Sequence, residues 1–540
     1  MKSTVYLKAT ISLLASCTYA YSEYASDLLT QSMTFMDSVY DAKAGYLYNI
    51  YYALQHETRS SSWYAAGLLA RNEKDDCEQA VKILNNIIDG QFLNASEQWY
   101  GDYQTYPEEA YPGTEVYPAV IYNTWDPNWR GFIGTAMIVC YEEFGHLLPG
   151  DLKERMVKSL HLDAIGDTYR VFGVDDDNLA PFYSNAALMK AAVSGWVGRK
   201  VGDANITAEG ETWSQEIVDL FNQNDTLAEL NSPTYFGVSL FALTLGAKYL
   251  PADSVLGSHA PRMIGETWEL VGDLYNANMK NIAGPWDRSY GYDLNRYLAI
   301  MSLWIWSFVG FEQSPLYPKP TAVGHVDDFE FGPLIAIMAD YHKTFVSEKA
   351  VKALTSFGES RLVHRSAYSP AFDHVPRNYS TFVSPKLSIG AQSFSENVVG
   401  GPSVNPGQFN PVVVQWLREE DGQHRVGFMS LWPETQALQA EVSEKRLNLT
   451  YPLVNDTSKF VFLVDSNGMA GPKKVKSWND IAGLKVKVSG TVEPQPETSF
   501  CGINGGWCDT VHDFDVWNFT YTMAPGSTQV PNIILDFEVA

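Results

Sequence analysis

The fold of this chain is decided by two consecutive segments, NAALMKAAVSGWV (Asn185–Val197) and TAEGETWSQEIVDLFN (Thr207–Asn222). The first is apolar or small on almost every side, whereas the second carries charges on one helical face and apolar residues on the other. A helix of the first kind is buried all round, and a helix of the second kind is wetted on one face. The pair therefore predicts an inner and an outer helix joined as a hairpin.

This pairing recurs between about Ser22 and Glu359 and predicts an (α/α)6-7 toroid of helical hairpins. A further helix is expected at 26–40, and a seventh hairpin has room between Phe92 and Trp129. Apolar inner helices are expected at 61–70, 131–144, 185–197, 232–250, 296–309 and 332–341, and amphipathic outer helices at 75–88, 150–162, 207–222, 260–279 and 347–357.

After about His364 the pattern changes to period-two alternation between turn residues, which is typical of antiparallel strands. Helices first and strands later predict an α+β multidomain chain with a toroid at 21–360 and an antiparallel β-sandwich at 361–540. The strands are expected at 379–383, 387–391, 411–416, 426–429, 460–464, 484–488 and 533–537.

The first twenty residues have the features of a secretory signal peptide. Met1 and Lys2 precede a short apolar run, and small residues precede a cut expected after Ala20. Seven Asn-x-Ser/Thr sequons follow, and no later apolar run reaches membrane length. The sequence therefore predicts a secreted, extracellular glycoprotein without a membrane span. The sequons are at Asn94, Asn205, Asn224, Asn378, Asn448, Asn455 and Asn518.

Four cysteines remain beyond the signal peptide. Cys501 and Cys508 flank a glycine-rich loop and are expected to form a disulfide bond in an oxidising compartment. Cys77 and Cys140 lie in helical patterns, where a second bridge and two buried free thiols are equally compatible with the sequence.

The formal charge of −25 argues against nucleic acid as a partner, because nucleic-acid recognition needs a basic surface. Aromatic residues make up 13% of the chain. Such an excess serves either to stack on sugar rings or to fill a large core. The sequence does not indicate an oligomeric state.

Unusual polar and aromatic residues cluster directly before five of the inner helices. Inner helices of a toroid run parallel, so their N-terminal ends share one mouth. Free N–H groups and the helix dipole at these ends suit an anion such as a uronate carboxylate. Ordinary helix capping explains Asn185, Ser232 and Asp328 equally well, but not the arginines and tryptophans. The clusters lie at 125–130, 177–185, 229–235, 284–292 and 325–329.

The clusters at 183–185, 229–235 and 288–292 resemble those of a toroidal glucuronan/alginate-type polysaccharide lyase family, over about residues 125–341. The resemblance implies β-elimination without a redox cofactor, acting on a uronic-acid polysaccharide. In that chemistry Asn185 and Arg288 would neutralise the substrate carboxylate, Tyr292 or Tyr290 would act as base and acid, and Glu229 would orient them. The residues expected to bind substrate are Trp125, Trp129, Arg130, Asn178, Asn231, Tyr235, Trp286 and His325.

One departure concerns the residue after Tyr235, where such lyases often have a histidine and this chain has Phe236. A tyrosine alone, or His325, would then carry the proton transfer. Because the reference pKa of tyrosine lies near 10, a phenol beside an arginine such as Arg288 is the better base.

Two other functions fit the same residues. A glycoside hydrolase needs one carboxylic acid and one carboxylate, and a non-catalytic glycan-binding protein needs only the aromatic mouth. No cofactor is expected, although a divalent metal held by His325, Asp327 and Asp328 is an open alternative to a structural histidine. Candidate carboxylates for hydrolysis are Asp126, Asp177, Glu229, Asp287 and Asp327.

Overall fold

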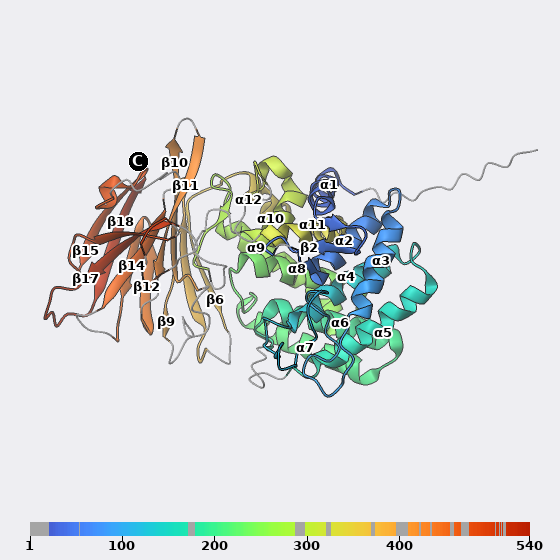
Figure 1. Cartoon of the computed structure of the whole chain (residues 1–540). Helices are drawn as coiled ribbons and strands as arrows, with labels where there is room; N and C mark the ends of the chain where they lie inside the picture. The colour runs from blue at the N-terminus through green and yellow to red at the C-terminus, as the bar shows by residue number, and fades with distance from the viewer. Residues whose placement is uncertain are drawn as a thin grey trace, which may run out of the picture.

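The computed structural model shows a helical region followed by a β region (Figure 1). The signal-like segment 1–20 lies outside the described residues. The described residues are 21–52, 54–170, 179–286, 298–319, 326–368, 373–395, 409–420, 423–432, 435–453, 458–465, 475–502, 504–506, 508, 510 and 515–539.

In the described part of residues 21–360, six inner and six outer helices form the toroid, which confirms the predicted helical hairpins. The inner helix α10 is not followed by an outer helix, and α1, the first helix of the chain, packs against α10 and α11 instead. The inner helices are α2 (Thr58–Arg71), α4 (Asn128–Phe144), α6 (Ser184–Val201), α8 (Pro233–Tyr249), α10 (Ala299–Val309) and α11 (Gly332–Lys343). The outer ones are α1 (Glu23–Asp37), α3 (Asp76–Asp89), α5 (Gly150–Asp167), α7 (Ala204–Asn224), α9 (Val255–Leu274) and α12 (Glu348–Thr355).

The seventh hairpin expected between Phe92 and Trp129 is wrong. The segment 90–127 is described throughout and holds turns and isolated bridges but no helix. Pro107, Pro112 and Pro118 interrupt it, and each proline lacks the N–H that a helix interior needs. Helix α1 also ends earlier than expected, because a small sheet of β1 (Tyr40–Asp41), β2 (Tyr46–Tyr48) and β3 (His56–Glu57) follows it.

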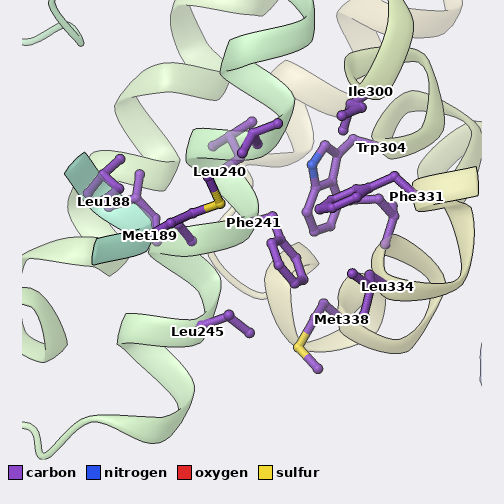
Figure 2. Close-up of a cluster of buried hydrophobic side chains, with 14 of the residues drawn as sticks. Leu188, Met189, Leu240, Phe241, Leu245, Ile300, Trp304, Phe331, Leu334 and Met338 are labelled. Atoms are coloured by element: carbon purple, nitrogen blue, oxygen red, sulfur yellow. The ribbon is translucent and has the colours of Figure 1, made fainter. Parts of the chain in front are cut away.

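Apolar side chains fill the centre of the toroid. Figure 2 shows side chains of α6, α8, α10 and α11 converging there, with Phe331 just before α11. The rings of Phe241 and Phe331 meet edge to face at a centroid distance of 5.0 Å. Because the interior is packed, any cleft must lie at the ends of the inner helices. The labelled residues are Leu188, Met189, Leu240, Phe241, Leu245, Ile300, Trp304, Phe331, Leu334 and Met338.

Two antiparallel sheets form the β region, as predicted. The larger has the order β16-β17-β14-β11-β10-β8-β7-β6 and the smaller β15-β18-β13-β12-β9. The prediction missed β6, β9, β12, β13, β16 and β17. The strands are β6 (Arg361–Ala367), β7 (Arg377–Val383), β8 (Leu387–Gln392), β9 (Phe394–Ser395), β10 (Val412–Glu420), β11 (Gln423–Trp432), β12 (Ala437–Ser443), β13 (Arg446–Thr450), β14 (Lys459–Asp465), β15 (Leu484–Gly490), β16 (Glu497–Cys501), β17 (Val516–Thr522) and β18 (Asn532–Val539).

The larger sheet is buried on both faces near β8 and β10. Successive residues of a strand point to opposite faces, so Val412 and Val414 enter the sandwich core while Val413 packs with the helical core. A Cβ added at Gly390 would lie 1.7 Å from the carbonyl oxygen of Gly284. Only glycine permits the backbones to approach this closely, and the two regions therefore share one continuous interface.

The cysteines form one disulfide bond and leave two free thiols, which is one of the two arrangements that the sequence allowed. Cys501 and Cys508 form the expected disulfide bond. Cys77 and Cys140 are both free; Cys140 is buried, and the half-buried Cys77 donates to the Leu147 carbonyl at 3.3 Å. In the part of the chain that the structure describes, no helix has the length and apolar character needed to cross a bilayer.

Candidate functional site

Two adjoining cavities open at the N-terminal ends of the inner helices. Cavity A has a volume of about 890 Å³ and cavity B about 560 Å³, and both are lined by Arg59, Tyr122 and Asp126. Cavity A is also lined by Trp63, Asn128, Phe132, Tyr183, Asn185, Thr234, Tyr235, Val238, Ile300 and Asp328. Cavity B is also lined by Asn49, Tyr51, Tyr52, Glu57, Thr105, Tyr106, Asn123, Trp129 and Asp327.

The structure brings together residues from four of the clusters identified in the sequence. Asp126, Asn185, Tyr235 and Asp328 precede or begin α4, α6, α8 and α11, and all four line cavity A. The fifth cluster runs into residues 287–297, which lie outside the described residues. Parallel inner helices therefore place their N-terminal ends around one mouth.

Asn185 is held in this wall by Glu229. The Glu229 carboxylate accepts hydrogen bonds from the backbone N–H and from the side-chain amide of Asn185, at 3.1 and 2.9 Å. A carboxylate at this position caps α6 and interacts favourably with its dipole. The sequence predicted that the N-terminal end of α6 binds a substrate carboxylate. In the structure Glu229 already occupies this end, and it orients the amide of Asn185.

A chain of hydrogen bonds fixes Tyr183 on the neighbouring part of the wall. Arg170 donates to the Asn128 side-chain oxygen at 3.0 Å, and the Asn128 amide donates to the Tyr183 hydroxyl at 3.2 Å. Arg170 and Asn128 are both buried, so this arrangement is shielded from competing water. The Tyr183 hydroxyl thus has a set position at the edge of cavity A.

Arg59, at the start of α2, was missed by the sequence analysis. Its guanidinium lies 3.2 Å from Glu57 and 3.1 Å from Asp327. Burial lowers the pKa of Arg59, but the charges of Glu57 and Asp327 raise it further, so the net shift is upward and the group stays protonated. The signal in the sequence is the charged segment Glu57-Thr58-Arg59, which contains the cap and the first residues of the apolar helix α2.

Aromatic rings surround this guanidinium. It lies 5.1 Å from the ring centroid of Trp63, 5.2 Å from Trp129 and 5.4 Å from Phe132. Cation–π contacts of this kind hold an arginine flat against a wall. Arg59 is therefore fixed in position between the two cavities.

Asp327 and Asp328 have different partners. Asp327 accepts from the Tyr51 hydroxyl at 2.8 Å, and Asp328 accepts from the Thr234 hydroxyl at 3.4 Å. Burial and the Asp327 charge both raise the pKa of Tyr51 well above its usual value. Tyr51 is therefore a hydrogen-bond donor in this site and not a phenolate base.

Several residues chosen from the sequence lie away from both cavities. Arg130 has no exposed surface and donates to the carbonyls of Gln98 and Tyr100 at 3.1 and 2.9 Å. The side-chain amide of Asn231 donates to the Ala283 and Pro285 carbonyls at 2.8 and 2.6 Å. Trp125 and Trp286 are buried as well, whereas Trp129 lines cavity B.

The remaining candidates lie outside the described residues. These are Asn178, Arg288, Tyr290, Tyr292 and His325, together with the hydrolase candidates Asp177 and Asp287. Within the residues that the structure does describe, no three histidine, cysteine, aspartate or glutamate side chains are grouped as a metal site.

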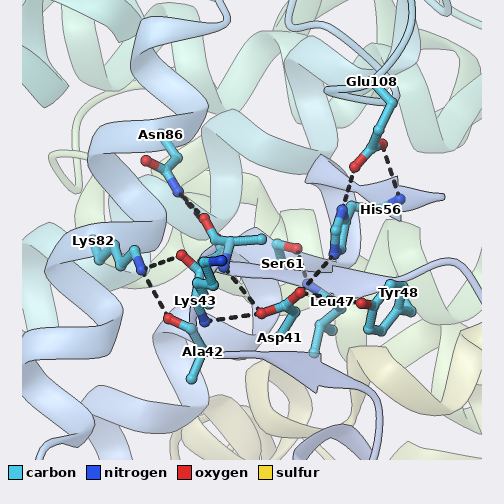
Figure 3. A network of polar contacts seen from close by, with 12 residues as sticks. Asp41, Ala42, Lys43, Leu47, Tyr48, His56, Ser61, Lys82, Asn86 and Glu108 are labelled. Carbon is cyan, nitrogen blue, oxygen red and sulfur yellow. Dashed lines mark hydrogen bonds and ion pairs between the residues drawn. The ribbon is translucent and has the colours of Figure 1, made fainter. Parts of the chain in front are cut away.

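The sequence analysis also missed a polar network around His56 (Figure 3). The His56 ring contacts Glu108 through Nδ1 and lies 3.6 Å from Asp41 through Nε2, while Tyr48 stacks on it at 4.4 Å. Burial raises the pKa of Glu108, but its hydrogen bonds with His56 lower it by more. The network ties the segment that carries Tyr106 to the β1–β3 sheet.

The chain belongs to a family described as a domain of unknown function (DUF8769), whose model matches residues 26–340. A second domain of unknown function (DUF8770) matches residues 359–538. No curated protein is similar enough in sequence to match.

The solved structures that are similar to this chain include two that match at low TM-scores. One is a heparinase III, with a TM-score of 0.31 and 9% identity over 96% of this chain and 84% of the other. The other is a chondroitin AC lyase from Streptomyces coelicolor, solved in complex with chondroitin sulphate, with a TM-score of 0.34 and 8% identity over 96% and 80%. At these values neither likeness bears on function.

Proposed function

We propose that this protein is a polysaccharide lyase that cleaves a uronic-acid-containing polysaccharide by β-elimination in cavity A. The observation that carries the proposal is the arrangement of Asn185 and Tyr235, which begin adjacent inner helices and line the same cavity. The Glu229 carboxylate accepts a hydrogen bond from this amide, and we propose that it orients the amide toward the substrate.

In the proposed reaction the Asn185 amide donates to the substrate carboxylate and so acidifies the proton on C5. A phenol, Tyr235 or one of Tyr290 and Tyr292, exchanges protons with the sugar. The C5–H bond and the bond from C4 to the leaving oxygen break, a C4=C5 double bond forms, and the leaving oxygen receives a proton. The proposed elimination does not need a redox cofactor.

The chain is also proposed to be secreted and glycosylated. Asn94, Asn205 and Asn378 are exposed sequon positions, and a disulfide bond suits an oxidising compartment. The side chain of Asn518, in contrast, is buried and donates to Thr510 at 3.0 Å. Endoglycosidase treatment of secreted protein should reduce its mass, with no glycan at Asn518. Secreted material that retains Met1 would contradict this proposal.

The decisive experiment incubates the enzyme with glucuronan, alginate and mixed uronic-acid polymers and follows ultraviolet absorbance of unsaturated ends. Tyr235→Phe preserves shape and should lower turnover by about a hundredfold or more if Tyr235 transfers the proton. Asn185→Ala should lower it similarly, because the substrate carboxylate loses its donor. Tyr24→Phe, on the exposed side of α1, is the matched control and should leave turnover unchanged. Saturated products alone would contradict elimination.

A second candidate, glycoside hydrolysis, is favoured by one observation. Asp126 and Asp328 line cavity A together, and hydrolysis needs an acid and a carboxylate across the scissile bond. In that case Asp126→Asn and Asp328→Asn would abolish cleavage, Tyr235→Phe would have a mild effect, and the products would have saturated ends.

A further inference from the structure

Tyr183 is a phenol in the wall of cavity A to which the proposed reaction gives no role. It directly precedes α6, close to Asn185, and both side chains line the cavity. Its backbone is held on both sides, because its N–H donates to the Ala180 carbonyl at 2.9 Å and its carbonyl accepts from the Ala187 N–H at 3.0 Å. The ring therefore lines cavity A from a fixed starting point.

Arg170 sets the direction of the hydrogen bond between Asn128 and Tyr183. A guanidinium has only donors, so the side-chain oxygen of Asn128, 3.0 Å from Arg170, must be the acceptor there. The amide nitrogen of Asn128 then faces Tyr183 and donates to the phenol oxygen at 3.2 Å. The proton of Tyr183 is consequently not used in this bond.

The Asn128 donor is held rigidly. Arg170 is buried and also donates to the Pro127 carbonyl at 3.3 Å, and Asn128 is the buried first residue of α4. A donor fixed in this way stabilises negative charge on its acceptor without having to reorient. Because hydrogen bonds to an ionised oxygen are the stronger ones, the contact strengthens when Tyr183 gives up its proton.

Tyr51, in the wall of cavity B, has the opposite arrangement. Its hydroxyl donates to the Asp327 carboxylate at 2.8 Å. Loss of this proton would leave two negative oxygens at hydrogen-bond distance, and like charges so close repel each other. Tyr51 is therefore kept as a donor, whereas Asn128 gives Tyr183 a partner for the charge that proton transfer leaves behind.

We propose that Tyr183 is the general acid of cavity A, which protonates the leaving oxygen, and that Asn128 is the residue that positions it. This inference rests on the proposed lyase function. In the elimination the base removes the C5 proton, the C4=C5 double bond forms, and the bond from C4 to the leaving oxygen breaks. The Tyr183 proton moves to that oxygen, which leaves as a hydroxyl group. Exchange with water then returns the phenolate and the protonated base to their starting states.

A leaving group that needs no proton tests the acid. Each variant is assayed on a uronic-acid polymer that the wild type cleaves and on a phenyl 4-deoxy-4-fluoro-glucuronide, from which elimination expels fluoride. Tyr183→Phe should lower kcat on the polymer by about a hundredfold or more, with KM within about threefold. Fluoride release should stay within about threefold of the wild-type rate, because fluoride leaves as an anion.

Asn185→Ala separates this loss from general damage to the site. It should slow both reactions about equally, since the C5 proton must be acidified whichever group leaves. Equal losses on the two substrates in Tyr183→Phe would overturn the acid assignment, and so would full turnover of the polymer.

Asn128→Asp tests the positioning residue. The carboxylate keeps an oxygen for Arg170 but cannot donate to Tyr183, so kcat on the polymer should fall by at least about tenfold while fluoride release is unchanged. Asn222→Asp is the matched control, because Asn222 is exposed on α7 and its side-chain oxygen also accepts from an arginine, Arg262. Asn128→Leu repeats the test if Asn128→Asp does not fold. Full polymer turnover in the variant that folds would overturn the role of Asn128.

The two proposals fail in different ways. If the wild type yields unsaturated products and Tyr183→Phe cleaves the polymer at the full rate, the lyase function stands and the acid assignment falls. If the wild type yields only saturated ends, the lyase function falls, and the assignment of Tyr183 as the acid of an elimination falls with it.

Discussion

The starts of α2 and α4 each place an arginine among carboxylates, but only one of the two arginines lines a cavity. Arg59 pairs with Glu57 and Asp327 and forms part of both cavity walls. Arg130 lies 3.7 Å from Asp167, donates to two backbone carbonyls and has no exposed surface. An arginine before an inner helix is thus not a sign of function by itself, and its side chain must also reach the mouth.

The difference follows from what surrounds each helix. Around Arg130, the carboxyl groups of Asp102, Asp163 and Asp167 are buried between the inner and outer helices. Such groups are tolerated only when protonated or compensated by a positive charge. Arg130 therefore stabilises the fold, whereas Arg59 has a cavity on one side.

The largest expected effect is on stability, and it tests the structural role of Arg130. Arg130→Met should lower the free energy of unfolding by about 3–5 kcal/mol, since it removes a buried cation beside Asp167 and leaves Arg170 as the arginine partner of that carboxylate. Chemical denaturation measures this loss. Arg155→Met, which removes a more exposed pair with Asp89, should cost less than about 1 kcal/mol. A fully stable Arg130→Met protein that no longer binds substrate would reverse the comparison.

The same substitution at Arg59 should act mainly on function. Arg59→Met removes the guanidinium from the wall that both cavities share, and we expect kcat/KM to fall by about a hundredfold. The stability loss should be smaller than at Arg130, because water in the cavities can solvate the carboxylates left behind. Turnover and thermal unfolding, measured on one preparation, separate the two effects. Full activity in Arg59→Met would remove Arg59 from the site.

These arginines also show what could be predicted from sequence. Helix and strand periodicity located the toroid and the sandwich, because burial on one face or on all faces leaves a regular pattern. The same reasoning chose Arg130, which is next to Trp129, and passed over Arg59, which has no aromatic neighbour in sequence. Trp63 lies one helical turn after Arg59 in α2, but the rings of Trp129 and Phe132 belong to α4, and only the fold brings them to Arg59.

The sequence also did not reveal which residue of each cluster points into the cavity. Asn185 and Tyr235 line cavity A, but Asn231, four residues before Tyr235, bonds to the backbone of a different segment. A loop before a helix has no fixed period, so spacing does not reveal which side chain points to the mouth. Asn185 and Glu229, in contrast, lie in two of the predicted clusters and are hydrogen-bonded to each other, and the orienting role of Glu229 stays a prediction.

A smaller effect concerns pH and the carboxyl groups near Arg130. Burial raises the pKa of Asp102 to about 8, although Arg130 opposes the shift. The folded state then keeps a proton that the unfolded chain releases near pH 4, so stability should fall as pH rises from about 4 to 8, by at most about 1.4 kcal/mol per pH unit. Asp102→Asn should flatten this part of the curve of Tm against pH. An unchanged slope would contradict a protonated Asp102.

The smallest expected effect concerns Tyr51, which donates a hydrogen bond to Asp327, one of the partners of Arg59. Tyr51→Phe removes the hydrogen bond to Asp327, which is worth about 1 kcal/mol, and should lower kcat/KM by less than about fivefold. Tyr48→Phe, whose hydroxyl donates to Asp41 at 3.1 Å outside the cavity lining, is the control. A loss in Tyr51→Phe as large as that in Arg59→Met would show that Tyr51 itself contacts the sugar.

The close contact of Gly390 with Gly284 has a consequence for how such chains can be recombined. The backbone of Trp286 exchanges hydrogen bonds with Asn410 at 3.1 and 3.0 Å, and the Thr381 hydroxyl donates to the Gly284 carbonyl at 2.7 Å. The sandwich is therefore not an interchangeable accessory. A toroid joined to a foreign sandwich would lack the glycine at this point of contact, and the segment leading to residues 288–292 would lose its anchor.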